Sequence, residues 1–222
     1  MYGPLPRLNE ALKVLTEEKI MSNRYLDLGC GDGSITKKVA EIVKATHIYG
    51  VDLDSNALSK AKNKGIKVFR LDLSKDSLPF DDGSIDLVSA FEVIEHLINP
   101  DHALTEIFRV LRAGGYFLLS TPNLASWVNR LMLPLGYQPY NVEVSTKILA
   151  GVPLKACTFT KPTGHIMAFT LRALKELLSF HKFKIVKVKG AAGVYPKRLT
   201  PIDKLFSKKA TLARRLIVLA TK

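Results

Sequence analysis

Residues 27–33, Asp-Leu-Gly-Cys-Gly-Asp-Gly, have the composition of a turn that binds a nucleotide. Glycines after a first strand let a ligand approach the backbone, and the N-terminus of the next helix lies behind them. The glycines follow at intervals of two and two. A dinucleotide fingerprint needs intervals of two and three, which would place its last glycine at position 34, and this position is Ser34. No GxxxxGKS/T sequence occurs, so a P-loop is excluded.

The charges of this glycine segment favour a cationic ligand. Asp27 stands two residues before the first glycine, and Asp32 lies inside the segment. Two carboxylates beside a pyrophosphate would each repel it by an energy on the order of kcal/mol. S-adenosylmethionine carries ammonium and sulfonium charges and no phosphate, so we expect it to be the ligand. Asp52, at the end of the second predicted strand, would then accept hydrogen bonds from both ribose hydroxyls.

A second group of reactive side chains, Glu92, Glu95 and His96, follows the fourth predicted strand. If residues 92–98 form a helical turn, the three share one face at i, i+3 and i+4. Such a group binds a cation or does acid–base work. Glu92 could instead hold the methionine end of the donor, and methyl transfer from a sulfonium needs mainly positioning, without a metal.

The elements that must position these residues alternate along the chain. Strands are predicted at residues 25–28, 47–52, 66–71, 85–91, 116–120, 183–188 and 215–220, and helices at 8–20, 34–43, 55–64, 100–111 and 170–181. This order predicts an α/β fold of Rossmann-like type, with a mostly parallel central sheet, helices on both faces and an antiparallel C-terminal strand. The ligand should lie beyond the carboxyl ends of the strands.

The length of 222 residues fits one domain, residues 1–222. Its least regular part is an insertion at about 123–165, where proline and glycine interrupt a predicted helix at 127–133. Long irregular segments in compact domains are usually functional or disordered. We expect this segment to cover the strand ends as a substrate cap, and a hydrophobic cap packed on the core is the alternative.

The net charge of +13 is a clear bias. It suits an anionic partner such as RNA, a phosphorylated metabolite or a membrane surface, or else a solvated lysine-rich surface whose densest stretch runs from Lys197-Arg198 to Arg214-Arg215. The two cysteines, Cys30 and Cys157, form no CxxC pair, which favours a reducing compartment. No apolar run approaches a membrane span, so we expect a cytoplasmic protein.

Residues 24–122 resemble the class I methyltransferases that use S-adenosylmethionine, specifically the type 11 group with the ubiquinone-biosynthesis O-methyltransferases. The motifs that carry the resemblance are the acidic-x-Gly-x-Gly-x-Gly segment at 27–33, the ribose-binding segment at 50–54 and the adenine-binding segment at 70–74 with 78–80. The resemblance implies the class I methyltransferase fold. It also implies donor contacts from Asp27, Gly29, Cys30, Gly31, Asp52, Leu53, Asp72, Leu73, Phe91 and Glu92.

Residues 120–123 and 164–170 are similar to segments of the small-RNA 3′-terminal 2′-O-methyltransferases. In that family an ExxEH motif and a later histidine coordinate a divalent ion, which implies Glu92, Glu95, His96 and His165 as ligands of Mg²⁺ or Mn²⁺ here. The chain departs from the family at residues 166–168, where Ile-Met-Ala replaces a tryptophan-bearing stretch, and it carries no appended RNA-binding module.

The expected function is therefore O-methylation of a small-molecule acceptor by in-line transfer, with His96 and Glu95 as the catalytic residues. Two alternatives stay open. One is a metal-dependent RNA 2′-O-methyltransferase, which the net charge and the ExxEH motif favour. The other is a non-catalytic partner protein that binds S-adenosylmethionine.

Overall fold

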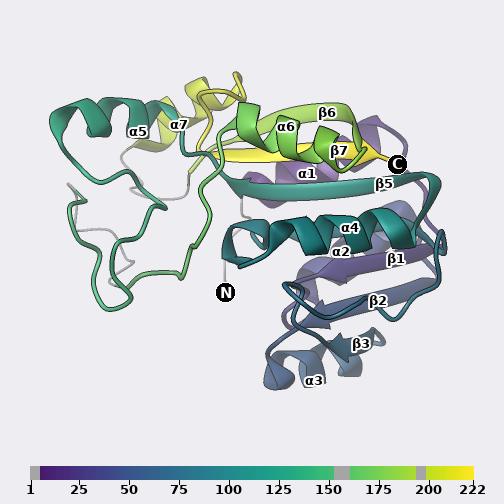
Figure 1. Cartoon of the computed structure of the whole chain (residues 1–222). Coiled ribbons are helices and arrows are strands. Elements are labelled where there is room, and N and C mark those ends of the chain that lie inside the picture. Colours follow the sequence, from purple (N-terminus) through teal and green to yellow (C-terminus); the bar gives the residue numbers. More distant parts are fainter. Residues whose placement is uncertain (1–5, 153–160, 194–198) are drawn as a thin grey trace.

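The computed structural model describes residues 6–152, 161–193 and 199–222. Cys157 and the basic pair Lys197-Arg198 lie outside these residues. The described chain forms a seven-stranded sheet with layers of helices around it (Figure 1). Its strands are β1 (Arg24–Leu28), β2 (His47–Asp52), β3 (Lys67–Arg70), β4 (Ile85–Phe91), β5 (Leu111–Pro122), β6 (Lys184–Ala191) and β7 (Arg215–Thr221).

The strand order is β3-β2-β1-β4-β5-β7-β6. The five strands from β3 to β5 are mutually parallel, and β7 runs antiparallel to both of its neighbours. This confirms the predicted Rossmann-like sheet with an antiparallel C-terminal strand. The order reverses at β1, between β2 and β4, so the carboxyl end of β1 is the topological switch point where ligands of such sheets bind.

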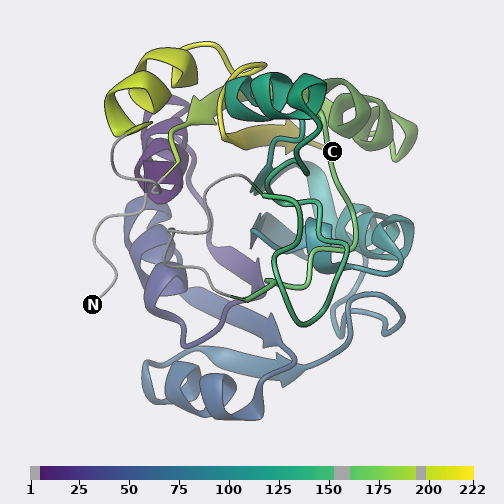
Figure 2. The same cartoon turned by 90° about the vertical axis from the view of Figure 1, so that its left-hand side faces the viewer.

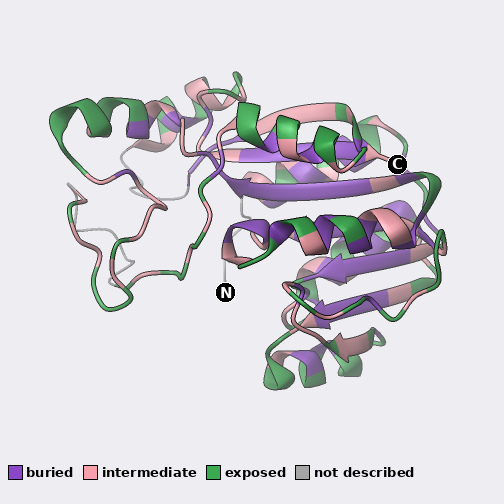
Figure 3. Cartoon of the chain, in the orientation of Figure 1, coloured by how far each residue is buried: buried purple, intermediate pink, exposed green. Residues whose placement is uncertain are grey.

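Both faces of the sheet are covered, as right-handed crossovers require. Helices α1 (Pro6–Glu17) and α2 (Ser34–Val43) share a core with Tyr25 and Leu87. Helices α4 (Pro100–Val110) and α6 (Leu171–Phe180) share the other core with Leu26 and Val88. Neighbouring residues of one strand thus enter opposite cores, as the alternation of side chains along a strand demands. Figure 3 shows the sheet buried between these helices.

The structure differs from the sequence prediction in three elements. Strand β5 spans residues 111–122, several residues longer at its start than predicted, because it also pairs with β4 at Leu111. The helical turn expected at 92–98 is a short 3-10 helix, η1 (Ile94–His96). A helix that the sequence did not predict, α7 (Thr200–Ser207), packs beside α5 (Trp127–Met132), where the rings of Phe206 and Trp127 stack 5.3 Å apart.

The segment expected as a substrate cap lies between β5 and α6. It contains α5 and the 3-10 helix η2 (Leu133–Leu135), and its later described residues form no helix or strand. Figure 2 looks onto the carboxyl ends of the parallel strands, and this segment, teal to green, crosses in front of them. Helix α3 (Ser55–Asn63) lies beside β2 and β3 at the far edge of the sheet. In the described residues, no helix is long and apolar enough to cross a membrane.

Candidate functional site

Two of the three glycines in the loop after β1, Gly29 and Gly31, have different surroundings. Both Gly29 and Gly31 have positive φ angles, +68° and +53°, which suit glycine best. A Cβ atom on Gly29 would lie 2.5 Å from a methyl group of Val93, so this glycine allows close packing. A Cβ atom on Gly31 would have nothing within 4 Å. Gly31 therefore faces open space at the strand ends, where a ligand could reach its backbone.

Asp52, the last residue of β2, is held at this open edge by the backbone. One carboxylate oxygen accepts a hydrogen bond from the Gly31 N–H at 2.8 Å, and the other accepts one from the Asp54 N–H at 3.0 Å. Each carboxylate oxygen can accept more than one hydrogen bond. Asp52 is therefore preoriented and keeps capacity for two hydroxyl groups of a ligand.

Asp27, in β1, lies beneath the loop instead of at its edge. Its side chain is buried, and its two oxygens accept hydrogen bonds from the hydroxyls of Ser89 and Thr36. Burial raises the pKa of the Asp27 carboxyl to about 6, partly offset by these hydrogen bonds. In this structure Asp27 ties β1 to β4 and α2, and so supports the loop that a donor would contact.

The second loop carboxylate, Asp32, is engaged at the surface. It accepts hydrogen bonds from the Lys64 ammonium at 2.8 Å and from the Ser34 hydroxyl at 2.8 Å. The Lys64 hydrogen bond, with those from Ser34, lowers the pKa of Asp32 to about 2. Asp27 is buried and Asp32 is paired with a lysine. These two carboxylates therefore no longer support the charge argument against a pyrophosphate. Asp52 is the carboxylate that remains at the open edge.

Three further residues predicted to contact the donor lie around this edge. Cys30 is buried, and its sulfur lies under β2, where a Cβ atom on Gly50 would come within 2.7 Å of it. Burial raises the pKa of the Cys30 thiol to about 12, so it is a neutral packing group. Leu53 is 58% exposed beside Asp52, and Phe91 is half-buried at the end of β4.

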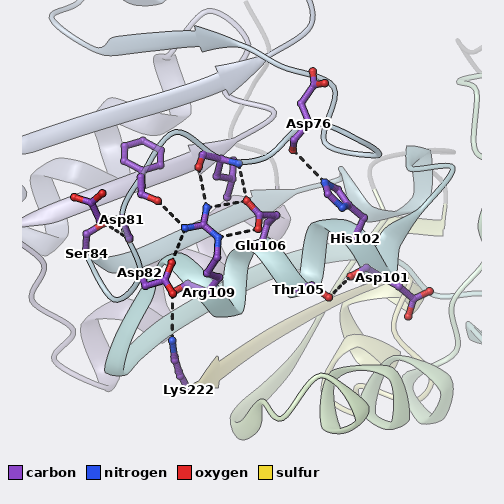
Figure 4. A network of polar contacts seen from close by, with 12 residues as sticks. Asp76, Asp81, Asp82, Ser84, Asp101, His102, Thr105, Glu106, Arg109 and Lys222 are labelled. Carbon is purple, nitrogen blue, oxygen red and sulfur yellow. Dashed lines mark hydrogen bonds and ion pairs between the residues drawn. The ribbon is translucent and has the colours of Figure 1, made fainter.

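The segment that resembles an adenine-binding site is anchored from below by α4. Arg109 donates hydrogen bonds to the carbonyls of Leu78 and Phe80, and Glu106 accepts one from the Leu78 N–H at 2.7 Å (Figure 4). Ahead of this anchor, Asp72 is half-buried and Leu73 is buried.

Leu73 also lines an apolar pocket between the sheet and α4, together with Leu28, Val93 and Leu97. This gap belongs to the core between the sheet and α4 and is far smaller than a ligand pocket.

Glu92 follows β4 in an unusual conformation and has charged partners. Its φ angle is +57°, which is rare for a residue with a side chain. Its carboxylate accepts hydrogen bonds from Arg215 Nε at 2.7 Å and Ser120 Oγ at 3.0 Å, and Arg7 Nε lies 3.9 Å away. Burial alone would raise the pKa of Glu92, but the charges of Arg215 and Arg7 outweigh it and lower the pKa.

Glu95, in η1, is an almost fully buried acid. One oxygen accepts a hydrogen bond from Thr121 Oγ1 at 3.0 Å, and the other has no hydrogen-bond partner among the described residues. Burial, and then the charge of Glu92, raise the pKa of Glu95 to about 8. A buried polar atom without a partner is costly, and its presence commonly marks a functional site.

Two histidines complete the site. The Nδ1 atom of His96 lies 3.0 Å from the carbonyl oxygen of Gly164, and the rings of His96 and His165 are 4.8 Å apart. Ligand atoms of Glu95, His96 and His165 all lie within 4.8 Å of one another. Burial, and then the charge of His96, lower the pKa of His165.

The structure thus brings together three of the four predicted metal ligands. Glu92 lies outside their group, because it precedes η1 at a positive φ and its carboxylate is bound by Arg215 and Ser120.

Sequence reasoning missed several residues of this site. They are Arg7, Thr121, Glu143 and Arg215, which come from α1, β5, the cap and β7. Each contact joins residues at least 20 positions apart, so no local spacing indicates it. The only sequence signal is the Arg214-Arg215 pair at the start of the last strand, which the sequence alone places in a basic surface stretch.

Comparison with known proteins agrees with this geometry. Residues 26–119 match a family model described as a methyltransferase domain. A probable S-adenosylmethionine-dependent methyltransferase of Mycolicibacterium smegmatis is 38% identical over 98 residues, which cover 44% of this chain and 37% of the relative. A ubiquinone biosynthesis O-methyltransferase of Dechloromonas aromatica is 33% identical over 109 residues, which cover 47% of this chain and 46% of the relative. The match thus spans less than half the length of these relatives.

Solved structures share the fold over nearly the whole chain. An S-adenosylmethionine-dependent methyltransferase from Mesorhizobium loti aligns with a TM-score of 0.64 over 96% of each chain, at 21% identity. That likeness concerns the fold, and the family match concerns the segment that carries the glycine loop and Asp52. Residues 26–119 therefore match a methyltransferase domain, and the chain shares the fold of solved S-adenosylmethionine-dependent methyltransferases.

Proposed function

We propose that this chain is an active enzyme that transfers a methyl group from S-adenosylmethionine to an oxygen of a small-molecule acceptor. The observation that carries the proposal is the pairing of two features at one edge of the sheet. Asp52, fixed beside the open Gly31, ends β2, while the buried Glu95 and the half-buried His96 follow β4. Only β1 separates these two strands.

The donor half of the site already presents groups that suit a nucleoside. Asp52 is already oriented by two N–H groups, and both of its oxygens can accept ribose hydroxyls. Gly31 leaves room at the backbone, and the half-buried Asp72 lies in the segment that resembles an adenine-binding site. When bound, S-adenosylmethionine supplies a sulfonium methyl group that is transferred in line to a positioned nucleophile.

The acceptor half can take a proton from a hydroxyl group. Because a carbonyl oxygen only accepts, the contact with Gly164 places a proton on Nδ1 of His96. Nε2 of the neutral ring then carries a lone pair and can act as a general base. The nearby Glu95, with its pKa raised, can hold a proton or hydrogen-bond the acceptor. This chemistry favours an oxygen acceptor, as proposed.

Calorimetry with S-adenosylhomocysteine tests donor binding, and a radiolabelled donor with a panel of catechols and other phenols tests the acceptor class. We expect binding with a stoichiometry of about one, and label in an ether product. A folded protein that binds no S-adenosylhomocysteine at about millimolar ligand would overturn the proposal. Transfer exclusively to amines would retain the methyltransferase activity and reject the oxygen acceptor.

A metal-assisted form of the reaction is the second candidate, and the group Glu95, His96 and His165 favours it. The unpartnered Glu95 oxygen and the two imidazoles make a mixed oxygen and nitrogen donor set for a divalent ion, and the two imidazoles favour a transition ion such as Mn²⁺ over Mg²⁺. Such an ion would polarise an acceptor hydroxyl and lower its pKa. Glu92 would join the ligands only by releasing Arg215 and Ser120.

Chelation separates the two forms. Loss of transfer in EDTA, restored by added Mn²⁺, would support the metal, and full activity in EDTA would reject it. If the labelled donor marks RNA and binding weakens steeply with salt, the acceptor is RNA, which the net charge of +13 would favour.

The remaining expectations from the sequence stay predictions. We propose that the cap at about 123–165 selects the acceptor, since it crosses the strand ends beside His96 and His165. A cytoplasmic location also remains a prediction. Donor binding without transfer to any acceptor in the panel would favour the non-catalytic alternative.

A further inference from the structure

We propose that Glu143, in the cap, is a positioning residue that fixes the ring and the tautomer of His96 through the turn at residues 163–165. This inference rests on the proposed role of His96 as a base or a ligand. It assigns a purpose to a carboxylate that neither the sequence motifs nor the donor site uses.

The Glu143 carboxylate gathers the donors of three consecutive residues. One oxygen accepts hydrogen bonds from the Thr163 N–H and from the Thr163 hydroxyl, both at 2.7 Å. The other accepts from the Gly164 N–H at 2.7 Å and the His165 N–H at 3.3 Å. The Glu143 side chain is only 10% exposed, so water competes weakly for these contacts. One side chain therefore shapes the whole turn.

The opposite side of this turn docks on η1. The Gly164 carbonyl accepts from His96 Nδ1 at 3.0 Å. The N–H groups of Ile166 and Met167 both donate to the Glu95 carbonyl, at 2.8 and 2.9 Å. Residues 163–167 have no helix or strand of their own, so these contacts on two sides are what holds them. The turn therefore links Glu143 to η1, which carries Glu95 and His96.

The chemical consequence lies in the choice of ring nitrogen. With Gly164 in place, the proton is kept on Nδ1, and Nε2 presents its lone pair. If the turn relaxes, the Gly164 carbonyl no longer selects Nδ1, and the proton can move to Nε2. His96 could then neither accept a proton nor bind a cation through Nε2.

A glutamine cannot replace Glu143, because both oxygens are acceptors and an amide would turn an NH₂ group toward N–H donors. The Glu143→Gln variant should therefore lose the turn at nearly constant volume. Thr163→Val removes the hydroxyl contacts with Glu143 and with the His165 ring but keeps the three backbone hydrogen bonds to Glu143, so His96 should keep its proton on Nδ1. Glu176→Gln, at an exposed position of α6, is the matched control.

The test is ¹⁵N NMR of the histidine side chains at about pH 9, above the usual titration range of imidazole. In the unaltered protein and in Glu176→Gln, His96 should carry its proton on Nδ1. In Glu143→Gln the proton should move largely to Nε2, while S-adenosylhomocysteine affinity changes by less than about two-fold and kcat falls about ten-fold or more.

An unaltered protein with the His96 proton on Nε2, or a Glu143→Gln variant with it still on Nδ1, would overturn the inference. Because the NMR signal needs no acceptor, this outcome is distinct from a failure of the proposed methyl transfer. Should Glu143→Gln not fold, Glu143→Asp withdraws the carboxylate by one methylene group and must also release the Nδ1 proton.

Discussion

The donor and acceptor halves of this site are built on opposite principles. In the donor half, backbone groups orient the key side chain. Gly31 and Asp54 orient Asp52 through their N–H groups, and the charged pair Asp32–Lys64 lies at the surface. In the acceptor half, ionisable side chains with little exposure lie close together: the Glu92 side chain is 15% exposed beside Arg215, and Glu95 is 1% exposed.

The difference also concerns sequence distance. Asp52 is reached from Gly31 across 21 positions, within neighbouring elements of one parallel unit. Glu92 is reached from Arg215 across 123 positions, through the last strand of the sheet. The donor half is therefore a property of a local β-α-β unit, whereas the acceptor half exists only when the complete sheet and the cap have assembled.

The largest effect should come from Asp52, the anchor of the donor half. Asp52→Ala removes two hydrogen bonds from a charged group, at about 1.5–3 kcal/mol each, so S-adenosylhomocysteine affinity should fall roughly 100- to 10,000-fold. Calorimetry measures it, with the exposed Asp81→Asn as control. Glu95→Gln, in the acceptor half, should bind the ligand nearly as well as the unaltered protein. Equal losses in Asp52→Ala and Glu95→Gln would remove the distinction between the halves.

The partly buried ion pair of the acceptor half should matter more for stability than the exposed one of the donor loop. Arg215→Met leaves the half-buried Glu92 with Ser120 and the more distant Arg7, which should cost about 2–3 kcal/mol, below the value for a fully buried pair. Lys64→Met breaks a pair whose side chains are 35% and 51% exposed, and should cost less than about 1 kcal/mol. Urea unfolding of both variants gives the comparison, and similar costs would contradict it.

The two loop glycines should separate stability from binding. Gly29→Ala adds a methyl group that meets Val93 at 2.5 Å at a strained φ, so we expect a loss of about 2–3 kcal/mol in unfolding free energy. Gly31→Ala strains the backbone by about 1–2 kcal/mol but fills space open to the donor. Thermal unfolding and calorimetry together should show Gly29→Ala as the less stable variant and Gly31→Ala as the weaker binder. The reverse ranking would place the donor elsewhere.

The smallest effect concerns pH and Glu95, whose pKa is raised from 4.5 to about 8 by burial and by Glu92. Between these values the folded chain keeps a proton that the unfolded chain has lost. Because the unfolded chain ionises first, the free energy of unfolding is highest below the unfolded pKa, falls as the pH rises towards the folded pKa, and levels off above it.

From about pH 7 to pH 9, above the range where Asp27 titrates, the unaltered protein should lose about 1 kcal/mol more than Glu95→Gln. Urea unfolding with chelator present measures this difference. The exposed Glu176→Gln should follow the unaltered protein. An equal pH dependence in Glu95→Gln would show that Glu95 is ionised in the fold.

The fold could be predicted because each strand and helix of the first half carries its own periodic pattern. The helix at 34–43 and the strands at 47–52 and 85–91 lie where the sequence predicted them. Helix α7 was missed because it is short, and its packing depends on the distant Trp127. The expectation for residues 92–98 was wrong in shape, since spacing alone cannot show that Glu92 takes a positive φ.

The candidate site divides in the same way. The position of Asp52 followed from its place at the end of a strand, and the structure adds the two N–H groups that orient it. The burial of Asp27 and the pairing of Asp32 with Lys64 were not predictable, because they depend on the hydroxyl of Ser89 and on the packing of α3 against the loop. Glu143 was likewise invisible in the sequence, since its partners begin 20 residues further along.

A crystal structure with S-adenosylhomocysteine bound tests most directly whether the two halves form one active site. We predict both ribose hydroxyls on the Asp52 carboxylate, the base beside Leu73, and the sulfur directed toward Glu95 and His96. A ligand whose ribose lies away from Asp52, or whose sulfur points away from the end of β4, would contradict the proposed methyl transfer.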